Sequence, residues 1–99
     1  MSFYVYVIGS QNKDKFITYV GYTNNLKKRL NLHNAGKGAK FTKGRVWKII
    51  YCEKFNTKRE ALSREYYIKK NRKFRNFIKE SHEWVKKLQY YYPTKKNIH

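Results

Sequence analysis

The sequence predicts one small α/β domain of the α+β type, in which strands and helices share a single core. Its 99 residues leave room for one domain, because domains typically span roughly 100–200 residues. Three runs of β-branched and aromatic residues predict strands, and the patterns between and after them predict helices. Ten tyrosines and six phenylalanines predict a compact, aromatic core.

Two of the apolar runs predict an antiparallel hairpin. Residues 3–8 (FYVYVI) and residues 16–22 (FITYVGY) are separated by residues 9–15, which are polar and predict a turn. The first run is apolar throughout, which favours a central strand or one buried on both faces. The third run, residues 46–51 (VWKIIY), predicts a further strand that extends to Phe55.

Two tyrosines and a glycine are notable in the predicted hairpin. Side chains alternate across a strand, so Tyr6 shares one face of the first strand with Tyr4, and Tyr19 shares one face of the second strand with Gly21. In the matching register, Tyr6 and Tyr19 are neighbours. Gly21 has no side chain to pack, which indicates a bulge or a close approach by another group.

The first predicted helix covers residues 25–34 (NLKKRLNLHN). Thr23 or Asn24 is expected to cap its beginning, and Gly36 is expected to end it in a left-handed conformation. Such a helix has about three turns.

Arg29 and His33 lie one turn apart on this helix, beside an apolar stripe formed by Leu26 and Leu30. Two interpretations are open. In the structural one, Arg29 extends to solvent or pairs with an acid, and His33 is an ordinary half-buried histidine. In the functional one, both belong to a site. Considered in isolation, the pair fits the structural interpretation better.

A longer helix is predicted over residues 57–70, where Thr57 and Glu60 form the T-x-x-E capping-box pattern. The phase of the apolar residues then slips, which predicts a break near Asn71 and another helix over about residues 73–80. A last short helix is predicted to pack on the core through Trp84, Val85 and Leu88. Residues 1–88 thus form the expected domain, and residues 89–99 a basic aromatic tail. This tail is either disordered, which is favoured for its last six residues, or its tyrosines stack on bases.

Glu65 falls within the stripe of this helix that is expected to face inward. The apolar members of that stripe are Ala61, Leu62, Tyr66 and Ile68. Burying a carboxylate costs several kcal/mol unless it is paired or binds a metal. Glu65 is therefore either a partner of Arg29 or another arginine, or a metal ligand that faces a cleft.

The charge of the chain predicts a polyanionic partner. Lys and Arg number 24 against six Asp and Glu, which gives a net charge of +18 spread over nearly the whole length. Nucleic acid is the favoured partner because basic side chains bind phosphates. A membrane surface, an acidic protein and a ribosomal-type structural role remain alternatives that charge alone does not separate.

The segment of residues 35–45 (AGKGAKFTKGR) is rich in glycine and basic residues. It is either a solvated connector or a loop that binds phosphates, and the total charge favours the second interpretation. The expected nucleic-acid contacts are Lys28, Lys37, Lys40, Lys43, Arg45, Lys69 and Lys70, together with Gly21.

Cysteine usage and the N-terminus exclude some classes of protein. The single Cys52 cannot form an intramolecular disulfide and, with three scattered histidines, does not supply a zinc site of the usual spacing. The apolar run at the N-terminus is too short for a signal peptide or a membrane span. We expect a cytoplasmic protein without a membrane partner or a small-molecule cofactor.

Taken together, these motifs resemble the GIY-YIG nuclease domain. The resemblance rests on VYV around Tyr6, YVG at residues 19–21, Arg29, His33 four residues later, and Glu65 on a later helix. It covers roughly residues 3–78 and is closest to small stand-alone bacterial members, which share GKGAK and a run similar to EALSREYYIKK. Each motif is weak alone, but their order and spacing are specific.

The resemblance implies a three-stranded antiparallel sheet flanked by helices. It also implies hydrolysis of DNA phosphodiester bonds with a divalent cation, Mg²⁺ or Mn²⁺. By position, Tyr6 would be the general base or would help to activate water, with Tyr19 hydrogen-bonded near it. Arg29 would stabilise charge on the scissile phosphate, His33 would assist proton transfer or hold the phosphate, and Glu65 would bind the metal.

The sequence departs from the family pattern at two places. Tyr4 and Val5 stand where the first motif has glycine and isoleucine. Many members also have an asparagine after the metal-binding glutamate, and Asn71 and Asn76 are both candidates for it.

The chemistry of the residues is consistent with this resemblance. A phosphodiester hydrolase needs an activated water and a cation that neutralises developing charge. The pKa of a free tyrosine is about 10, and the positive charge of the chain is expected to lower that of Tyr6. One carboxylate suits magnesium, which keeps several waters.

The leading hypothesis is a metal-dependent DNA endonuclease, structure- or single-strand-selective as one option, that acts in DNA repair, recombination or processing. The main alternative is a non-catalytic module of the same fold that binds DNA or RNA. A third is a structural protein of a ribonucleoprotein particle. A monomer is favoured.

Overall fold

The computed structural model describes the backbone of residues 1–91 and the side chains of residues 1–82. The elements are β1 (Phe3–Asn12), β2 (Lys15–Thr23), α1 (Leu26–Asn34), β3 (Lys48–Phe55), α2 (Lys58–Lys70) and α3 (Arg72–Tyr91). Both strand pairings are antiparallel and the sheet order is β2-β1-β3. The three-stranded antiparallel sheet with flanking helices is thereby confirmed.

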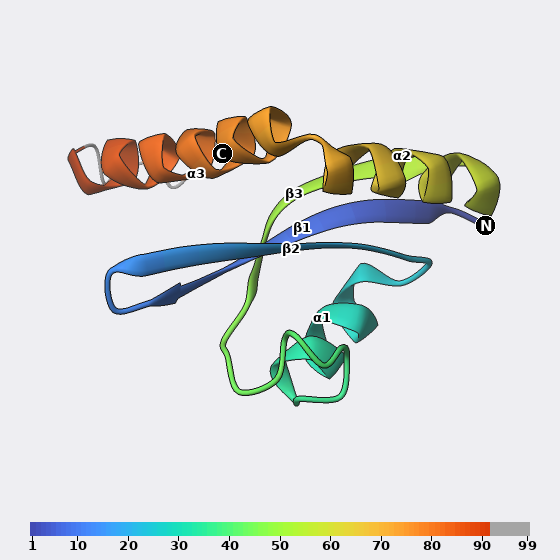
Figure 1. Ribbon diagram of the computed structural model, residues 1–99, viewed down its shortest axis with the longest axis horizontal. Coiled ribbons are helices and arrows are strands. Elements are labelled where there is room, and N and C mark those ends of the chain that lie inside the picture. Colours follow the sequence, from blue (N-terminus) through green and yellow to red (C-terminus); the bar gives the residue numbers. More distant parts are fainter. Residues whose placement is uncertain (92–99) are drawn as a thin grey trace.

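The sheet separates the molecule into two layers of helix (Figure 1). On one side lie α2 and α3, and on the other lie α1 and the long segment that leads to β3. The core beneath α2 and α3 consists of Val5, Val7, Val20, Ala61, Ile68 and Ile78. The core beneath α1 consists of Tyr6, Ile8 and Trp47. None of the helices in the described part of the chain is long and apolar enough to span a bilayer.

Strand β1 serves both cores because consecutive side chains point to opposite faces. Val5 and Val7 enter one core, Tyr6 and Ile8 enter the other, and all four are buried. The predicted central strand is therefore confirmed. Its pairing with β3 shifts register after Val7.

The hairpin between β1 and β2 is tighter than predicted. The strands continue to a pairing of Asn12 with Lys15, so only two residues remain for the turn. Lys13 adopts a φ of 57° there. This conformation usually selects glycine or asparagine. Because a lysine stands there instead, the sequence gives no signal for a two-residue turn, and the polar residues 9–15 indicated a longer one.

Helix α1 begins one residue later than its predicted caps, because Asn25 accepts a hydrogen bond from the Lys28 backbone N–H and is the N-cap. Its end is as predicted: Gly36 has a φ of 77°. The N–H groups of Gly36 and Lys37 bond to the carbonyls of His33 and Leu32, which is a Schellman motif.

Helix α2 has the predicted capping box, since the Thr57 side chain accepts from the Glu60 N–H and donates to its carboxylate. Its buried stripe is narrower than predicted. Ala61 and Ile68, two turns apart, are fully buried, whereas Leu62 and Tyr66 are 38% and 65% exposed. The expected inward position of Leu62 and Tyr66 was wrong because both fall on the flank of the helix.

The predicted break at Asn71 is confirmed, since this residue ends α2 and its side chain accepts from the Phe74 N–H. The two short helices predicted beyond it are one continuous helix, α3. Trp84, Val85 and Leu88 belong to α3, but their packing lies outside the described side chains. Most of the predicted tail, residues 92–99, lies outside the described residues altogether.

Strand β3 begins two residues after its predicted start. Val46 is 79% exposed, and Trp47 turns into the core before the strand begins. The Asn34 side-chain amide donates to the Trp47 backbone carbonyl, and its oxygen accepts from the Trp47 backbone N–H. These two bonds replace the strand pairing expected at this position.

Candidate active site

Tyr6 lies at the centre of the candidate site, on the face of β1 that is covered by α1. It pairs across the sheet with Gly21 on β2 and with Cys52 on β3. A Cβ atom at Gly21 would stand 2.4 Å from the Tyr6 hydroxyl oxygen. Gly21 is buried and leaves space for the Tyr6 side chain, so the expectation that it contacts nucleic acid directly does not fit its position.

The Tyr6 hydroxyl is bonded to His33, which extends from α1. The distance from Tyr6 Oη to His33 Nε2 is 2.8 Å, and His33 Nδ1 lies 2.9 Å from Thr42 Oγ1. His33 and Thr42 are fully buried. The expected half-buried histidine is therefore a completely enclosed one.

The direction of these bonds follows from Thr42. Its hydroxyl proton is donated to the Ala39 carbonyl at 3.0 Å, and its oxygen accepts the Ala39 N–H. Thr42 Oγ1 then accepts a proton from His33 Nδ1, because a hydroxyl has one hydrogen to donate. The Nε2 atom of neutral His33 is left as the acceptor of the Tyr6 O–H bond.

Arg29 completes the chain at its other end. Its Nε–H donates to Tyr6 Oη at 3.3 Å, and an Nη donates to the Gly38 carbonyl at 3.3 Å. Arg29 neither points freely into solvent nor pairs with an acid among the described residues. The guanidinium is thus held against the Tyr6 hydroxyl by α1 and the loop that follows it.

The pKa values of Tyr6 and His33 move apart. Burial raises the pKa of Tyr6 above its ordinary value, and the adjacent Arg29 guanidinium opposes this effect only in part. Burial also lowers the pKa of His33, and Arg29 contributes in the same direction. The expected lowering of the Tyr6 pKa by positive charge was wrong, because desolvation of the phenolate outweighs it. At neutral pH Tyr6 is a phenol and His33 an uncharged acceptor.

Tyr19 contacts this cluster through its ring. It pairs with Ile8, two positions from the pairing of Tyr6 with Gly21. Its ring lies edge-on to His33 at 5.3 Å between centroids and stacks on Phe41 at 6.0 Å. Tyr6 and Tyr19 thus share one face and both meet the His33 ring. Tyr19 encloses the imidazole from the edge strand.

Glu65 extends from α2, on the opposite face of the sheet. Its side chain is 15% exposed, and its carboxylate forms an ion pair with Lys69 Nζ at 3.2 Å. Within the described residues Glu65 therefore pairs with a lysine rather than with Arg29 or another arginine. Arg29 binds Tyr6 and Gly38, and Arg64 binds both carboxylate oxygens of Glu53. The negative charge of the Glu65 carboxylate makes a small contribution to the raised pKa of Tyr6, after burial and the opposing Arg29.

The donor set around Glu65 fits a hard, weakly ligated cation. Among the described residues, no three His, Cys, Asp or Glu side chains come together, which excludes a preformed zinc-type cage there. A single carboxylate, with water in the remaining positions, is sufficient for Mg²⁺. The Lys69 side chain, which is paired with this carboxylate, is 48% exposed.

Asn71 and Asn76 differ in the contacts of their side chains. The Asn71 amide donates to Tyr67 Oη, and its carbonyl oxygen caps α3. Asn76 is exposed on α3.

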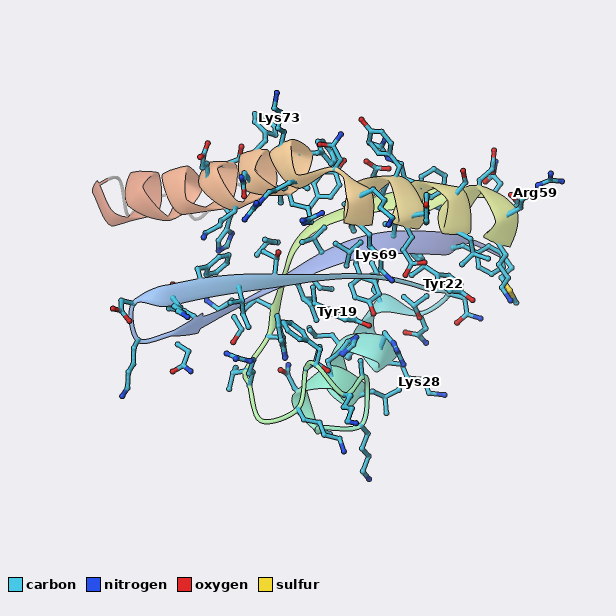
Figure 2. All side chains as sticks on the ribbon, viewed as in Figure 1. Tyr19, Tyr22, Lys28, Arg59, Lys69 and Lys73 are labelled. Atoms are coloured by element: carbon cyan, nitrogen blue, oxygen red, sulfur yellow. The ribbon has the colours of Figure 1, made fainter. Side chains whose placement is uncertain are left out.

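The basic residues expected to contact nucleic acid are not all on one surface. Lys69 extends from α2 toward the sheet edge where Tyr19 lies, whereas Lys73 points away from the sheet (Figure 2). Lys70 lies over the Tyr66 ring on the outer side of α2. Lys40 and Lys43 are exposed, and Arg45 is half-buried, all in the loop before β3.

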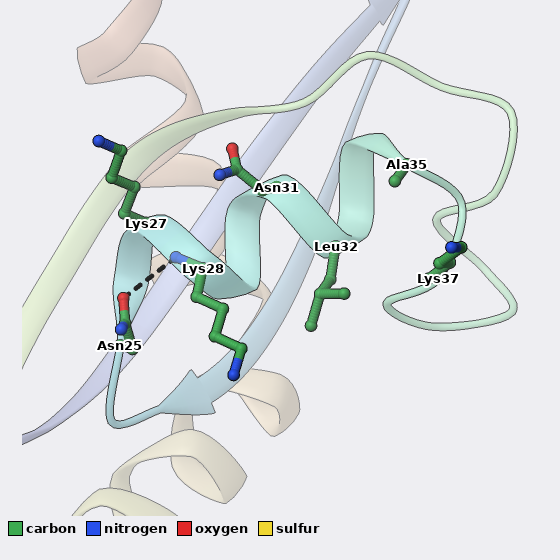
Figure 3. A pocket seen from close by; sticks show the side chains of 7 residues that line it. All are labelled: Asn25, Lys27, Lys28, Asn31, Leu32, Ala35 and Lys37. Atoms are coloured by element: carbon green, nitrogen blue, oxygen red, sulfur yellow. Dashed lines mark hydrogen bonds between the residues drawn. The ribbon is translucent and has the colours of Figure 1, made fainter.

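Lys28 and Lys37 line a hollow of about 440 Å³ on the outer side of α1. Figure 3 shows this hollow, with Lys27 and Lys28 at its helical end and Lys37 across from them. None of its lining residues, all within the described part of the chain, is acidic. The hollow is a basic surface adjacent to the helix that carries Arg29.

Gly38 and Thr42 are the two residues of the site that sequence reasoning did not single out. A Cβ atom at Gly38 would lie 2.3 Å from His33 Nδ1, so only glycine fits beside the imidazole. The sequence signal for Gly38 is its place in GKGAK, a pattern that indicates a solvated connector or a phosphate-binding loop rather than a contact with the imidazole. Thr42 gave no signal, because its partners are nine and three residues distant and meet only in the folded loop.

This geometry agrees with the comparison to known families. The family model described as the GIY-YIG catalytic domain matches residues 2–79. The chain belongs to this family, whose members are endonucleases that generally use divalent metal ions.

Its relatives are small bacterial proteins of one domain. The chain is 56% identical over 68 residues to the UPF0213 protein of Clostridium perfringens strain 13, which covers 68% of this chain and 70% of that protein. It is 51% identical over 70 residues to the UPF0213 protein of Bacillus licheniformis, covering 70% and 69%. The solution NMR structure of a UPF0213 protein from Bacillus halodurans is 34% identical and covers 81% of this chain and 84% of that one, with a TM-score of 0.46.

Proposed function

We propose that this protein is a metal-dependent endonuclease that hydrolyses DNA phosphodiester bonds. Its proposed active site consists of Tyr6, Tyr19, Arg29, His33 and Glu65. The family membership supports the class of reaction, and the arrangement of these side chains supports the assignment of their roles.

The observation that carries the proposal is the continuous chain of bonds from Arg29 through Tyr6 and His33 to Thr42. Three of these four side chains are buried in a core that apolar residues would fill at less cost. In this series of hydrogen bonds, the Tyr6 hydroxyl and both ring nitrogens of His33 each have a partner, as buried polar groups require. A buried phenol bonded to a neutral imidazole is an arrangement suited to proton transfer.

Tyr6 and His33 form the proposed proton pathway. Tyr6 Oη accepts a proton from the attacking water while its own proton passes to His33 Nε2. The lowered pKa of His33 keeps Nε2 unprotonated at neutral pH. This coupled transfer avoids a free phenolate, which the raised pKa of Tyr6 disfavours.

Arg29 is the proposed ligand of the scissile phosphate. Within the described part of the chain, its bonds to Tyr6 and Gly38 use two N–H groups. A guanidinium has five such donors in a fixed plane, so three remain for phosphate oxygens. Tyr19 holds the imidazole in place through its ring.

Glu65 is the proposed ligand of Mg²⁺ or Mn²⁺. A divalent cation at this carboxylate would neutralise charge that develops on the phosphodiester. Lys69, which is paired with Glu65, would release it on metal binding and become available to the substrate.

DNA is the proposed substrate because the surface is strongly basic, with a net charge of +18. The basic side chains on α1, α2 and the loop before β3 are the proposed backbone contacts. The described residues contain no second module that could read a long sequence, so local DNA structure, such as a single strand or a branch, is the expected determinant. Repair, recombination and processing of DNA in the cytoplasm, by a monomer, are the settings that fit.

The decisive experiment is a cleavage assay on single-stranded, duplex and branched DNA with Mg²⁺ or Mn²⁺. We expect cleavage by the wild type and none by Arg29→Ala or Glu65→Ala, with both variants folded by circular dichroism. Glu80→Gln is a control because Glu80 is an exposed carboxylate on α3.

Binding of all three DNA forms without cleavage of any would overturn the proposal in favour of a non-catalytic nucleic-acid-binding module. Equal loss of activity in Glu80→Gln would show that charge rather than a specific ligand is responsible.

A further inference from the structure

A cleft of about 410 Å³ opens beside the candidate active site, at the end of β2. This volume falls within the roughly 300–1,000 Å³ typical of small-molecule sites. Tyr22, one of its lining residues, lies at the end of β2 between α1 and α2 (Figure 2). The cleft is lined by Phe3, Tyr22, Thr23, Asn24, Arg29 and Lys58.

Arg29 links this cleft to the catalytic cluster. Its Nε and one Nη are fixed on Tyr6 and Gly38, and the residue also lines the cleft. A ligand that binds the remaining N–H groups of Arg29 therefore stands directly beside the Tyr6 hydroxyl. Through this shared residue, the cleft adjoins the position proposed for the scissile phosphate.

Lys58 supplies a second positive charge on the opposite wall, at the start of α2. Within the described part of the chain, no carboxylate lines the cleft, and Lys58 forms no ion pair. Two cations without a neighbouring acid attract an anion that bridges them. A phosphate is an anion of this size and charge.

Two aromatic rings in the lining of the cleft can contact a nucleic-acid base in addition to a phosphate. Tyr22 and Phe3 are half-buried and line it from neighbouring strands, and the Lys58 ammonium lies 6.0 Å from the Tyr22 ring centroid. Thr23 and Asn24 add polar side chains at the rim. Aromatic faces stack on nucleic-acid bases independently of sequence.

We propose that this cleft is a subsite for the nucleotide next to the scissile phosphate of a DNA strand. Its phosphate binds Arg29 and Lys58, and its base stacks on Tyr22. The assignment to a neighbouring nucleotide rests on the proposed endonuclease function, whereas the binding of a nucleotide in the cleft does not.

The direct test is an NMR titration of the ¹⁵N-labelled protein with thymidine 3′,5′-bisphosphate. This probe carries one base and the phosphates on both sides of it. We expect the largest shifts at the backbone amides of Tyr22, Thr23 and Asn24. Inorganic phosphate is titrated in parallel and is expected to bind at least fivefold more weakly, because it lacks a base to stack.

Matched variants separate the cleft from general electrostatics. Lys58→Ala is expected to weaken nucleotide binding roughly tenfold. Lys48→Ala removes the same charge from an exposed position at the far end of the sheet and is expected to leave binding near wild type. Tyr22→Leu is expected to lose about fivefold or more, and Tyr22→Phe to retain affinity, since it keeps the ring.

Equal effects of Lys58→Ala and Lys48→Ala, or equal affinity for phosphate and nucleotide, would overturn the proposal. The folding of each variant is read from the dispersion of the same spectra. Nucleotide binding in the cleft by a protein that cleaves no DNA would refute the endonuclease function and leave the subsite intact. Cleavage that is insensitive to Lys58→Ala and Tyr22→Leu would refute the subsite and leave the endonuclease function intact.

Discussion

The two faces of the sheet share the strand β1 but are built on different principles. Beneath α2 and α3 the buried side chains among residues 1–82 are all apolar. Beneath α1 the buried side chains include the hydroxyls of Tyr6 and Thr42 and the imidazole of His33. Apolar burial stabilises the first face without directional demands, whereas the second is stable only if each polar group has its partner.

This contrast separates the apolar core from the proposed proton pathway, which lies beneath α1, whereas the proposed metal ligand Glu65 extends from α2. Substitutions of the apolar core residues beneath α2 and α3 are expected to change the free energy of unfolding and leave the rate constant of the folded protein intact. Substitutions beneath α1 are expected to change catalysis more than stability. The following predictions test that division.

Tyr6→Phe is expected to have the largest effect. It removes the proposed proton acceptor and lowers the rate of cleavage by roughly 10²–10⁴-fold. It also leaves His33 Nε2 without its donor, which costs about 1–3 kcal/mol of stability. Single-turnover cleavage and denaturant unfolding measure the two effects. Tyr4→Phe, on the same face of β1, is the control, and an equal rate loss there would contradict the assignment.

Ile68→Ala tests the other face. Ile68 is fully buried beneath α2, so its truncation is expected to lower the free energy of unfolding by about 2–5 kcal/mol. The cleavage rate per folded molecule is expected to remain at the wild-type value. Leu62→Ala, at an exposed position of the same helix, is expected to stay within about 0.5 kcal/mol. A rate loss in Ile68→Ala at a temperature where it is fully folded would show that the faces are coupled.

Thr42→Val probes the polar face at its inner end. The variant keeps the shape of the side chain but removes the acceptor of the His33 Nδ1 proton, at an expected cost of about 1–3 kcal/mol. The His33 ¹⁵N chemical shifts are expected to report a changed tautomer, and cleavage is expected to fall about tenfold, as for a general base in the wrong tautomer. Thr42→Ser, which keeps the hydroxyl, is expected to restore both. A wild-type tautomer in Thr42→Val would refute this role.

The smallest effect concerns pH. Because burial lowers the pKa of His33, the unfolded chain binds a proton at this residue more readily than the folded one. Stability is therefore full above about pH 6.5, the ordinary histidine value, and is lost as the pH falls through the folded pKa. Glu53, whose pKa Arg64 lowers, adds a loss at more acidic pH.

Unfolding measured between pH 7 and pH 4 tests this assignment. His33→Gln is expected to remove the part of the pH dependence that begins near pH 6.5 and to keep the more acidic part. An unchanged profile in His33→Gln would mean that another group titrates.

The local features of the fold could be predicted from the sequence. The uninterrupted apolar run at residues 3–8 indicated a strand buried on both faces, and Thr57 with Glu60 indicated the start of α2. Gly36 indicated the end of α1. Each of these signals depends on residues close together in the chain, for which local geometry determines the outcome.

Features that depend on distant contacts were missed. The turn at Lys13 has a conformation that lysine rarely adopts, so its sequence carries no signal. Leu62 is apolar, as core residues usually are, but it lies on the flank of α2. The narrow buried stripe of this helix is formed by Ala61 and Ile68. The pKa of Tyr6 was predicted in the wrong direction because total charge is visible in a sequence and burial is not. The roles of the site residues stay predictions.

The strand order β2-β1-β3 also sets the order in which the molecule is assembled during synthesis. β1 emerges first from the ribosome yet becomes the central strand, and it must wait for β3, some forty residues later, to cover its second edge. Pairings of such separation form late. The proposed carboxylate ligand, Glu65, emerges later still. A nascent chain that ends before α2 therefore carries Tyr6, Arg29 and His33 but lacks the proposed metal ligand, so the proposed endonuclease would gain that ligand only after the residues of its proton pathway.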